Sequence, residues 1–216
     1  MHVTSLLLAI ATLITAQSVI MQYDTGEPSP KDRQVALCNE RLSPIPGWDV
    51  DITENAVFLT LSQGEMDVQI SDDWPVEGQF RIQLVAEGGE ASISVQPGYV
   101  NLPDRTRPNE YFWEDVLLTA SQGGHALFIS AVMILDLGIE HNGVKWIIVK
   151  YATDQDETAL LRTAAETGWQ DIRFDFTKAD AAEPFVRITV APDVLARGFP
   201  ASLQLLDWRD RGCPVE

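Results

Sequence analysis

TGWQDIRFDFT (residues 167–177) is the stretch that decides the predicted fold class, because polar and apolar side chains alternate along it. One face carries Ile172, Phe174 and Phe176, and the other carries Asp171, Arg173 and Asp175. Strict alternation is typical of a β-strand that has one face in a core and one face in water. The stretch therefore predicts a half-buried strand of an antiparallel sheet.

Similar strand-like segments recur along the chain and are separated by turn residues. They lie at residues 57–61, 66–70, 80–84, 92–95, 126–137, 145–151, 185–190 and 202–208. Residues 62–65 (SQGE) have the composition of a hairpin turn. Short strands without regular helical partners predict an all-β fold, an antiparallel β-sandwich in a single domain.

Two segments depart from simple alternation. Residues 126–137 form the longest apolar run and predict a central strand that is covered on both faces. Residues 156–166 are the one helical candidate, with Asp156 as N-cap and Gly168 near the end, and a strand is the alternative. At most one short helix is therefore expected.

The chain begins with an uncharged apolar segment at residues 3–21. We expect residues 1–21 to be a signal peptide. An uncleaved membrane anchor is the alternative, because about 19 uncharged residues are just long enough to cross a bilayer. Residues 22–36 are polar and contain proline, which predicts a flexible stem, and residues 37–216 then form the domain. Either way the body is expected outside the cytoplasm, secreted or periplasmic.

The formal net charge of −17 argues against nucleic acid and anionic membrane surfaces as partners. Such acidity is typical of a highly soluble protein, and calcium binding is the more specific interpretation. The local acid clusters, Asp72–Asp73 and residues 154–157, lack the glycine and the spacing of a dedicated calcium loop. Solvated loops are therefore the plainer interpretation of both clusters.

The chain has two cysteines, Cys38 and Cys213, near the two ends of the predicted domain. In an oxidising compartment a lone pair of thiols is normally a disulfide. Export therefore predicts a Cys38–Cys213 bridge, and two unpaired buried thiols are the alternative.

Several motifs in the second half of the chain follow each other in a characteristic order. They are GHALFISAVMILDL (124–137), VKWIIVKY (144–151), TGWQDIRFDFT (167–177), FVRITV (185–190) and ASLQLLDWR (201–209). Together with LCNERLSPIPGW (37–48), this order resembles the galactose-binding-like jelly-roll domains, especially the carbohydrate-binding modules of xylanases and β-glucanases. The sequence departs from that pattern at Arg41-Leu42, where an aromatic-acid pair is expected, and at Leu206-Asp207-Trp208, where two aspartates are usual.

The resemblance covers residues 37–209 and implies a jelly-roll topology. In such domains the first and last strands run side by side, which would bring Cys38 close to Cys213. Jelly rolls of this type often carry a structural calcium ion, and no other cofactor is expected.

Candidate binding residues are those that could stack on a sugar or grip its hydroxyl groups from the polar positions of the inner sheet. The first set is Trp146, Asp171, Arg173 and Arg187, and the second is Tyr111 and Trp113. A solvated outer face with cross-strand ion pairs is the alternative for the strand positions, and core packing is the alternative for the aromatic pair. Trp48 and Trp169, which follow glycines at strand starts, are predicted to be packing residues.

These features favour an exported, non-catalytic carbohydrate-binding domain that recognises a glycan. The sequence contains no nucleophile, zinc or phosphate-loop motif, and its 32 acidic residues make any pairing of catalytic carboxylates arbitrary. A structural or protein-interaction domain of a cell-envelope assembly is the second hypothesis, and an exported hydrolase is the third.

Overall fold

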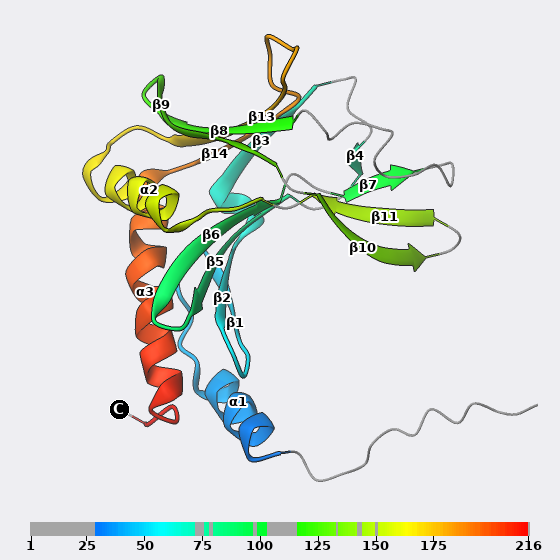
Figure 1. Ribbon diagram of the computed structural model, residues 1–216. Helices are drawn as coiled ribbons and strands as arrows, with labels where there is room; N and C mark the ends of the chain where they lie inside the picture. Colours follow the sequence, from blue (N-terminus) through cyan, green and yellow to red (C-terminus); the bar gives the residue numbers. More distant parts are fainter. Residues whose placement is uncertain are drawn as a thin grey trace, which may run out of the picture.

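The computed structural model describes residues 29–71, 76–77, 80–96, 99–102, 116–132, 134–141, 144–149 and 151–215 (Figure 1). The predicted leader, residues 1–21, lies outside these residues, as do Tyr111 and Trp113. The described chain is mostly β, with two antiparallel five-stranded sheets, a four-stranded sheet and three α-helices.

The first sheet contains β1 (Trp48–Ile52), β2 (Val57–Leu61), β5 (Arg81–Glu87), β6 (Glu90–Gln96) and β12 (Tyr151–Ala152), in that order. Alternate residues of β2 and β5 are fully buried, as their sequence pattern predicts. Leu59 and Leu84, for example, lie opposite each other in the register of β2 and β5 and are 0% exposed. This sheet therefore supplies one wall of the core.

The second sheet has the order β3 (Met66–Ile70), β14 (Val186–Val190), β13 (Ile172–Lys178), β8 (Val116–Gln122) and β9 (His125–Ala131). Ile172, Phe174 and Phe176 of β13 are 0% exposed, so the alternation that predicted this strand is confirmed. Their neighbours in register, Val186 and Ile188 of β14 and Leu118 and Ala120 of β8, continue the same buried face. Both sheets contribute to one hydrophobic core.

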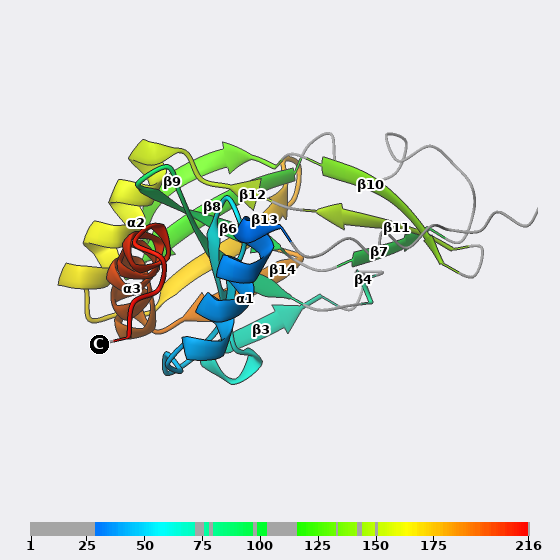
Figure 2. The same cartoon turned by 90° about the horizontal axis from the view of Figure 1, so that it is seen from below.

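The third sheet contains β10 (Ile134–His141), β11 (Val144–Val149), β7 (Tyr99–Leu102) and β4 (Val76–Glu77), all antiparallel. It lies on the side of the molecule opposite to the helices α2 and α3 in both views (Figures 1 and 2). The long apolar run at residues 126–137 is divided between this sheet and β9 of the second sheet.

Three helices complete the fold: α1 (Pro30–Arg41), α2 (Gln155–Thr167) and α3 (Pro192–Asp210), in addition to a short 3₁₀ turn, η1 (Gln63–Glu65). α3 packs against β2, β5 and β6, and α2 contacts α3, β6 and β9. Gly198 allows the close approach of α3, because a Cβ atom there would lie 2.6 Å from both Leu84 and Trp48. α1 lies near the end at which α3 terminates (Figure 1).

The prediction of at most one short helix is wrong. The candidate at residues 156–166 is helical, as α2, with Asp154 rather than Asp156 as its N-cap. α1 begins at Pro30, inside the segment predicted as a flexible stem, where Ser29 and Asp32 form a reciprocal capping box. In that box, hydrogen bonds from Ser29 lower the pKa of the Asp32 carboxyl.

The predicted last strand, residues 202–208, is also wrong, because this segment belongs to α3. Gly198 and Pro200 interrupt the helical pattern in the sequence. The long hydrophobic interface of α3 with the first sheet stabilises the helix nevertheless. The predicted cover on both faces of residues 126–137 also fails for its first part, because Ile129 of β9 is 60% exposed.

Candidate functional site

The polar side chains predicted on residues 171–175 and 187–189 do share one face of the second sheet. Arg173 lies opposite Thr189 in the register of β13 and β14, and Asp175 lies opposite Arg187. These four residues are half-buried, and Asp171 is exposed just before β13 begins. Their neighbours on the same strands alternate with them and point into the core. The face is thus the outer surface of the second sheet.

Arg187 forms a two-point ion pair with Asp175 across this face. Arg187 Nε lies 2.7 Å from Asp175 Oδ1, and Arg187 Nη2 lies 3.0 Å from Oδ2. The hydrogen bond to Asp175 raises the pKa of the Arg187 guanidinium. A satisfied cross-strand pair matches the alternative of a solvated outer face, and the pair lines neither of the two grooves described below. Arg173 has no hydrogen bond or ion pair among the residues that the structure describes.

The other aromatic candidates are dispersed. Trp146 lies in β11, opposite Asn101 and Ile139, and therefore belongs to the third sheet rather than to the sheet of Arg173 and Arg187. The expectation that these residues line one inner sheet together is therefore wrong. Trp48 is buried and packs beneath α3, as predicted, but Trp169 is 85% exposed, so its predicted role in packing is wrong.

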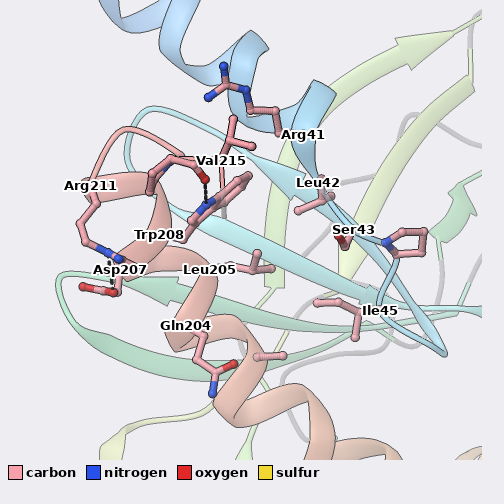
Figure 3. A pocket seen from close by; sticks show the side chains of 13 residues that line it. Arg41, Leu42, Ser43, Ile45, Gln204, Leu205, Asp207, Trp208, Arg211 and Val215 are labelled. Carbon is pink, nitrogen blue, oxygen red and sulfur yellow. Dashed lines mark hydrogen bonds and ion pairs between the residues drawn. The ribbon is translucent and has the colours of Figure 1, made fainter.

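A groove lies at the end of the molecule where α1 comes near the end of α3, and we call it the clasp groove (Figure 3). One wall is residues 41–45, which are the last residue of α1 and the segment after it, and the other is the last part of α3 with the tail, through Val215. Its volume is about 760 Å³. That size falls in the range of small-molecule sites, about 300–1,000 Å³.

An aromatic ring and several aliphatic side chains line the clasp groove. Trp208 is half-buried and donates its indole N–H to the Pro214 carbonyl oxygen at 3.0 Å. The polar edge of the ring is therefore already satisfied, so the surface that Trp208 offers a ligand is carbon. The surrounding aliphatic members are Leu42, Ile45, Ala201, Leu205 and Val215.

Planar polar side chains also line the clasp groove together with the Trp208 ring. Asp207 Oδ2 lies 3.0 Å from Arg211 Nε in an ion pair one helical turn apart. Arg41 Nη1 donates to the Cys213 carbonyl oxygen at 2.7 Å. Gln204 is exposed and lies one turn before Trp208 on α3. The groove thus combines a ring with both hydrogen-bond donors and acceptors.

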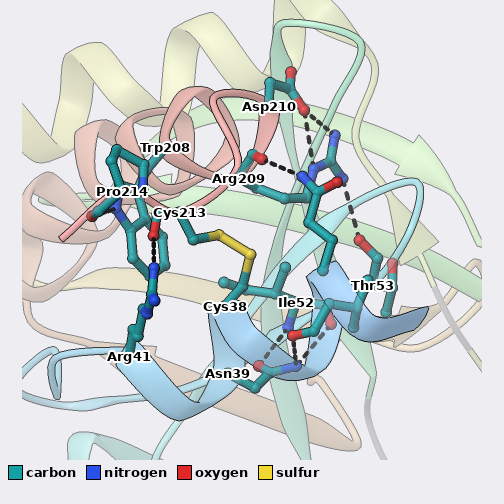
Figure 4. The surroundings of a disulfide bond; sticks show 12 residues. Cys38, Asn39, Arg41, Ile52, Thr53, Trp208, Arg209, Asp210, Cys213 and Pro214 are labelled. Carbon is teal, nitrogen blue, oxygen red and sulfur yellow. Dashed lines mark hydrogen bonds and ion pairs between the residues drawn. A yellow bond between two sulfur atoms is a disulfide. The ribbon is translucent and has the colours of Figure 1, made fainter. Parts of the chain in front are cut away.

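The Cys38–Cys213 disulfide connects the two walls (Figure 4). The pairing is confirmed, with the Cα atoms 5.3 Å apart and both residues fully buried. The bridge joins α1 to the tail after α3, however, and not a first strand to a last strand. Arg41 and Pro214, which belong to opposite walls, each lie within three residues of a bridged cysteine.

A smaller cleft of about 260 Å³ includes Lys31, Thr53 and Arg209. Arg209 has only 11% of its side chain exposed and binds Asp210 at 2.7 Å and the Thr53 carbonyl at 3.4 Å. Gln34 donates to the Arg209 carbonyl oxygen at 2.9 Å. Because its polar groups satisfy one another, this cleft is a structural junction between α1 and α3.

A polar cluster joins α2 to β9 and β12. The Glu157 carboxylate accepts hydrogen bonds from the hydroxyl groups of Ser130 and Tyr151, and also caps its own helix at Asp154. Burial and the bond to Glu157 raise the pKa of Tyr151 above its usual range. This half-buried cluster connects α2, β9 and β12 through hydrogen bonds within the protein.

Sequence reasoning missed the clasp groove because residues 202–208 were predicted as a strand. Helical spacing was the signal in the sequence that could have indicated the groove. Groove-lining residues recur along this segment at intervals of three and four: Ala201, Gln204, Leu205, Trp208 and Arg211. Only a helix places these side chains on one face.

Within the described residues, no three acidic, histidine or cysteine side chains are close enough together to hold a metal ion. Asp72 and Asp73 lie outside those residues, so the expected structural calcium stays a prediction. None of the described helices combines the length and the apolar character needed to cross a membrane.

Comparison with protein-family models, curated proteins and solved structures found no match to this chain.

Proposed function

We propose that this protein is an exported, non-catalytic carbohydrate-binding domain that holds a glycan in the clasp groove. The observation that carries the proposal is Trp208, whose N–H is satisfied by Pro214 while its ring lines a groove of about 760 Å³. Sugars present flat C–H surfaces, and an indole ring of this kind can stack on them.

The groove also supplies the second requirement of sugar recognition, which is planar polar groups beside the ring. The Asp207–Arg211 pair presents a carboxylate and a guanidinium together, and Gln204 adds an amide. Vicinal hydroxyl groups both donate and accept hydrogen bonds, so such a mixed set matches them. The proposal requires no covalent chemistry.

Export is part of the same proposal. The apolar leader at residues 3–21 and the buried disulfide both support an oxidising compartment, secreted or periplasmic. The jelly-roll topology implied by the sequence resemblance also stays a proposal, supported by two antiparallel sheets that share one core.

The test is a glycan array probed with the mature, oxidised protein, followed by titration of each hit. We expect Trp208→Ala to weaken binding at least tenfold and Trp208→Phe, which keeps a flat ring, to retain most of it. Trp169→Ala is the matched control, since Trp169 is an exposed tryptophan outside the groove, and should bind as wild type. Full binding by a folded Trp208→Ala variant would place the sugar elsewhere. An array without hits would overturn glycan recognition.

A second candidate function, a protein-interaction domain of an envelope assembly, has its own support. β9 is the terminal strand of the second sheet within the described residues, and Ile129 on it is 60% exposed. A strand edge of this kind can add a strand from a partner. Cross-linking in the native envelope should then capture a defined partner, and Ile129→Lys should abolish the cross-link while glycan binding persists. Unchanged cross-linking by Ile129→Lys would remove this candidate.

A further inference from the structure

The charges that line the clasp groove do not cancel. Arg41 and Arg211 are its cations, and Asp207 is its single acidic residue among those described. Asp207 is engaged by Arg211 at 3.0 Å. The groove therefore keeps one positive charge, in a chain whose net charge is −17.

That remaining charge belongs to Arg41. Its side chain is exposed and lines the groove (Figure 3), and Nη1 donates a hydrogen bond to the neutral carbonyl oxygen of Cys213 (Figure 4). It forms no ion pair with any carboxylate of the described residues, unlike Arg187, Arg197 and Arg209. One of its five N–H donors is used, and the others are left for a ligand.

The position of Arg41 is fixed from both sides. The bond to Cys213 anchors its guanidinium next to the disulfide, and Arg41 itself is the last residue of α1, three residues after Cys38. An arginine that is already anchored loses less side-chain freedom when it binds. Guanidinium groups fit carboxylates in a two-point geometry, which neutral hydroxyl groups cannot match in strength.

We infer that the clasp groove selects a glycan that carries a carboxylate, a uronic-acid sugar, with Arg41 binding the carboxylate while Trp208 stacks on the ring. This inference rests on the proposed function and adds the class of sugar to it. Asp207 and Arg211 then contact the neutral hydroxyl groups. The ligand's negative charge compensates the one cation that the groove leaves without a partner.

The test compares uronic-acid oligosaccharides with the same oligosaccharides after methyl esterification, which removes the charge and keeps the backbone. We expect the wild-type protein to bind the acid form at least tenfold more tightly, and added sodium chloride to weaken the acid form only. Arg41→Gln should reduce this preference to less than twofold, and Arg41→Lys should keep part of it.

Trp208→Ala supplies the matched control, because it should weaken both forms of the ligand by the same factor. Thermal melting of Arg41→Gln checks that the tail after α3 remains in place. Arg211→Gln is a second variant that removes a charge from the groove, and it leaves the hydrogen bond from Arg41 to the Cys213 carbonyl oxygen intact. Equal binding of acid and ester by the wild-type protein would overturn the inference and leave glycan recognition standing. Absence of binding to either form, and to neutral glycans, would overturn the proposed function itself.

Discussion

Cys38 in α1 is bonded to Cys213, which follows α3, across 175 residues of chain. The bridge fixes the relative position of the two segments that form the walls of the clasp groove. Cys213 has a positive φ of 53°, which a non-glycine residue adopts rarely. In this conformation its carbonyl oxygen accepts a hydrogen bond from Arg41.

Replacing both cysteines by serine should lower stability and widen the groove. Loop-closure entropy for a bridge of this span gives a loss of at most about 5 kcal/mol. Urea unfolding of the double variant measures the loss, and mass spectrometry of the non-reduced wild type should find no alkylatable thiol. Two free thiols in the exported protein would contradict both the bridge and the groove that it holds.

Gly198→Ala should destabilise the protein, although alanine normally favours helices over glycine by about 1 kcal/mol. The new methyl group would lie 2.6 Å from Trp48 and from Leu84, so α3 must move away from the first sheet. We expect a loss of about 1–3 kcal/mol in the free energy of unfolding. A stabilised variant would show that α3 does not pack as described.

Two arginines on the outer face of the second sheet provide a matched comparison. Arg187→Met breaks the pair with Asp175 and leaves that half-buried carboxylate without its partner, so about 1 kcal/mol of stability should be lost. Arg173→Met removes a side chain without a described partner and should cost less than about 0.5 kcal/mol. A double-mutant cycle with Asp175→Asn isolates the pair, and zero coupling would contradict the ion pair.

Stability should also fall at alkaline pH because of Tyr151. Its pKa is raised above the usual 10.0, mainly by burial and then by the hydrogen bond to Glu157. The folded state favours the neutral phenol of Tyr151. Its contribution to the free energy of unfolding is therefore complete below about pH 10 and is lost as the pH rises further. Urea unfolding from about pH 8 to 11 should show this decline. Tyr151→Phe should be less stable at pH 8 by about 1–2 kcal/mol and decline less steeply.

The Tyr151→Phe comparison separates this residue from the other tyrosines, of which the chain has three more. An equally steep decline in the variant would assign the alkaline transition to those tyrosines.

Strand periodicity was the most successful part of the sequence reasoning. Residues 57–61 and 172–176 alternate in sequence and alternate in burial, because one face of each strand lies against the core. Residues 66–70 also form a strand, but Ile70 at its end is 45% exposed. Helices were predicted less well. Ser29, Pro30 and Asp32 form a recognisable capping signal for α1, but the surrounding prolines suggested a stem.

The predicted binding residues lie in different sheets, which local sequence patterns could not predict. Alternation placed Asp171, Arg173 and Asp175 on one face, and the structure agrees for Arg173 and Asp175, but alternation could not say whether this face lines a groove or meets water. Trp146 alternates equally well and lies in another sheet. Which strands become neighbours depends on contacts between residues far apart in the chain, and local pattern carries little information about them.

By itself the sequence determined several strands with one buried face, the pair of cysteines and the strongly negative net charge, since each follows from local residue chemistry. The tertiary structure decided that residues 202–208 are helical and that Trp208, Arg41 and the tail meet around one groove. The physical reason is burial: an interface with the first sheet stabilises α3 across Gly198 and Pro200, and no local propensity predicts that gain.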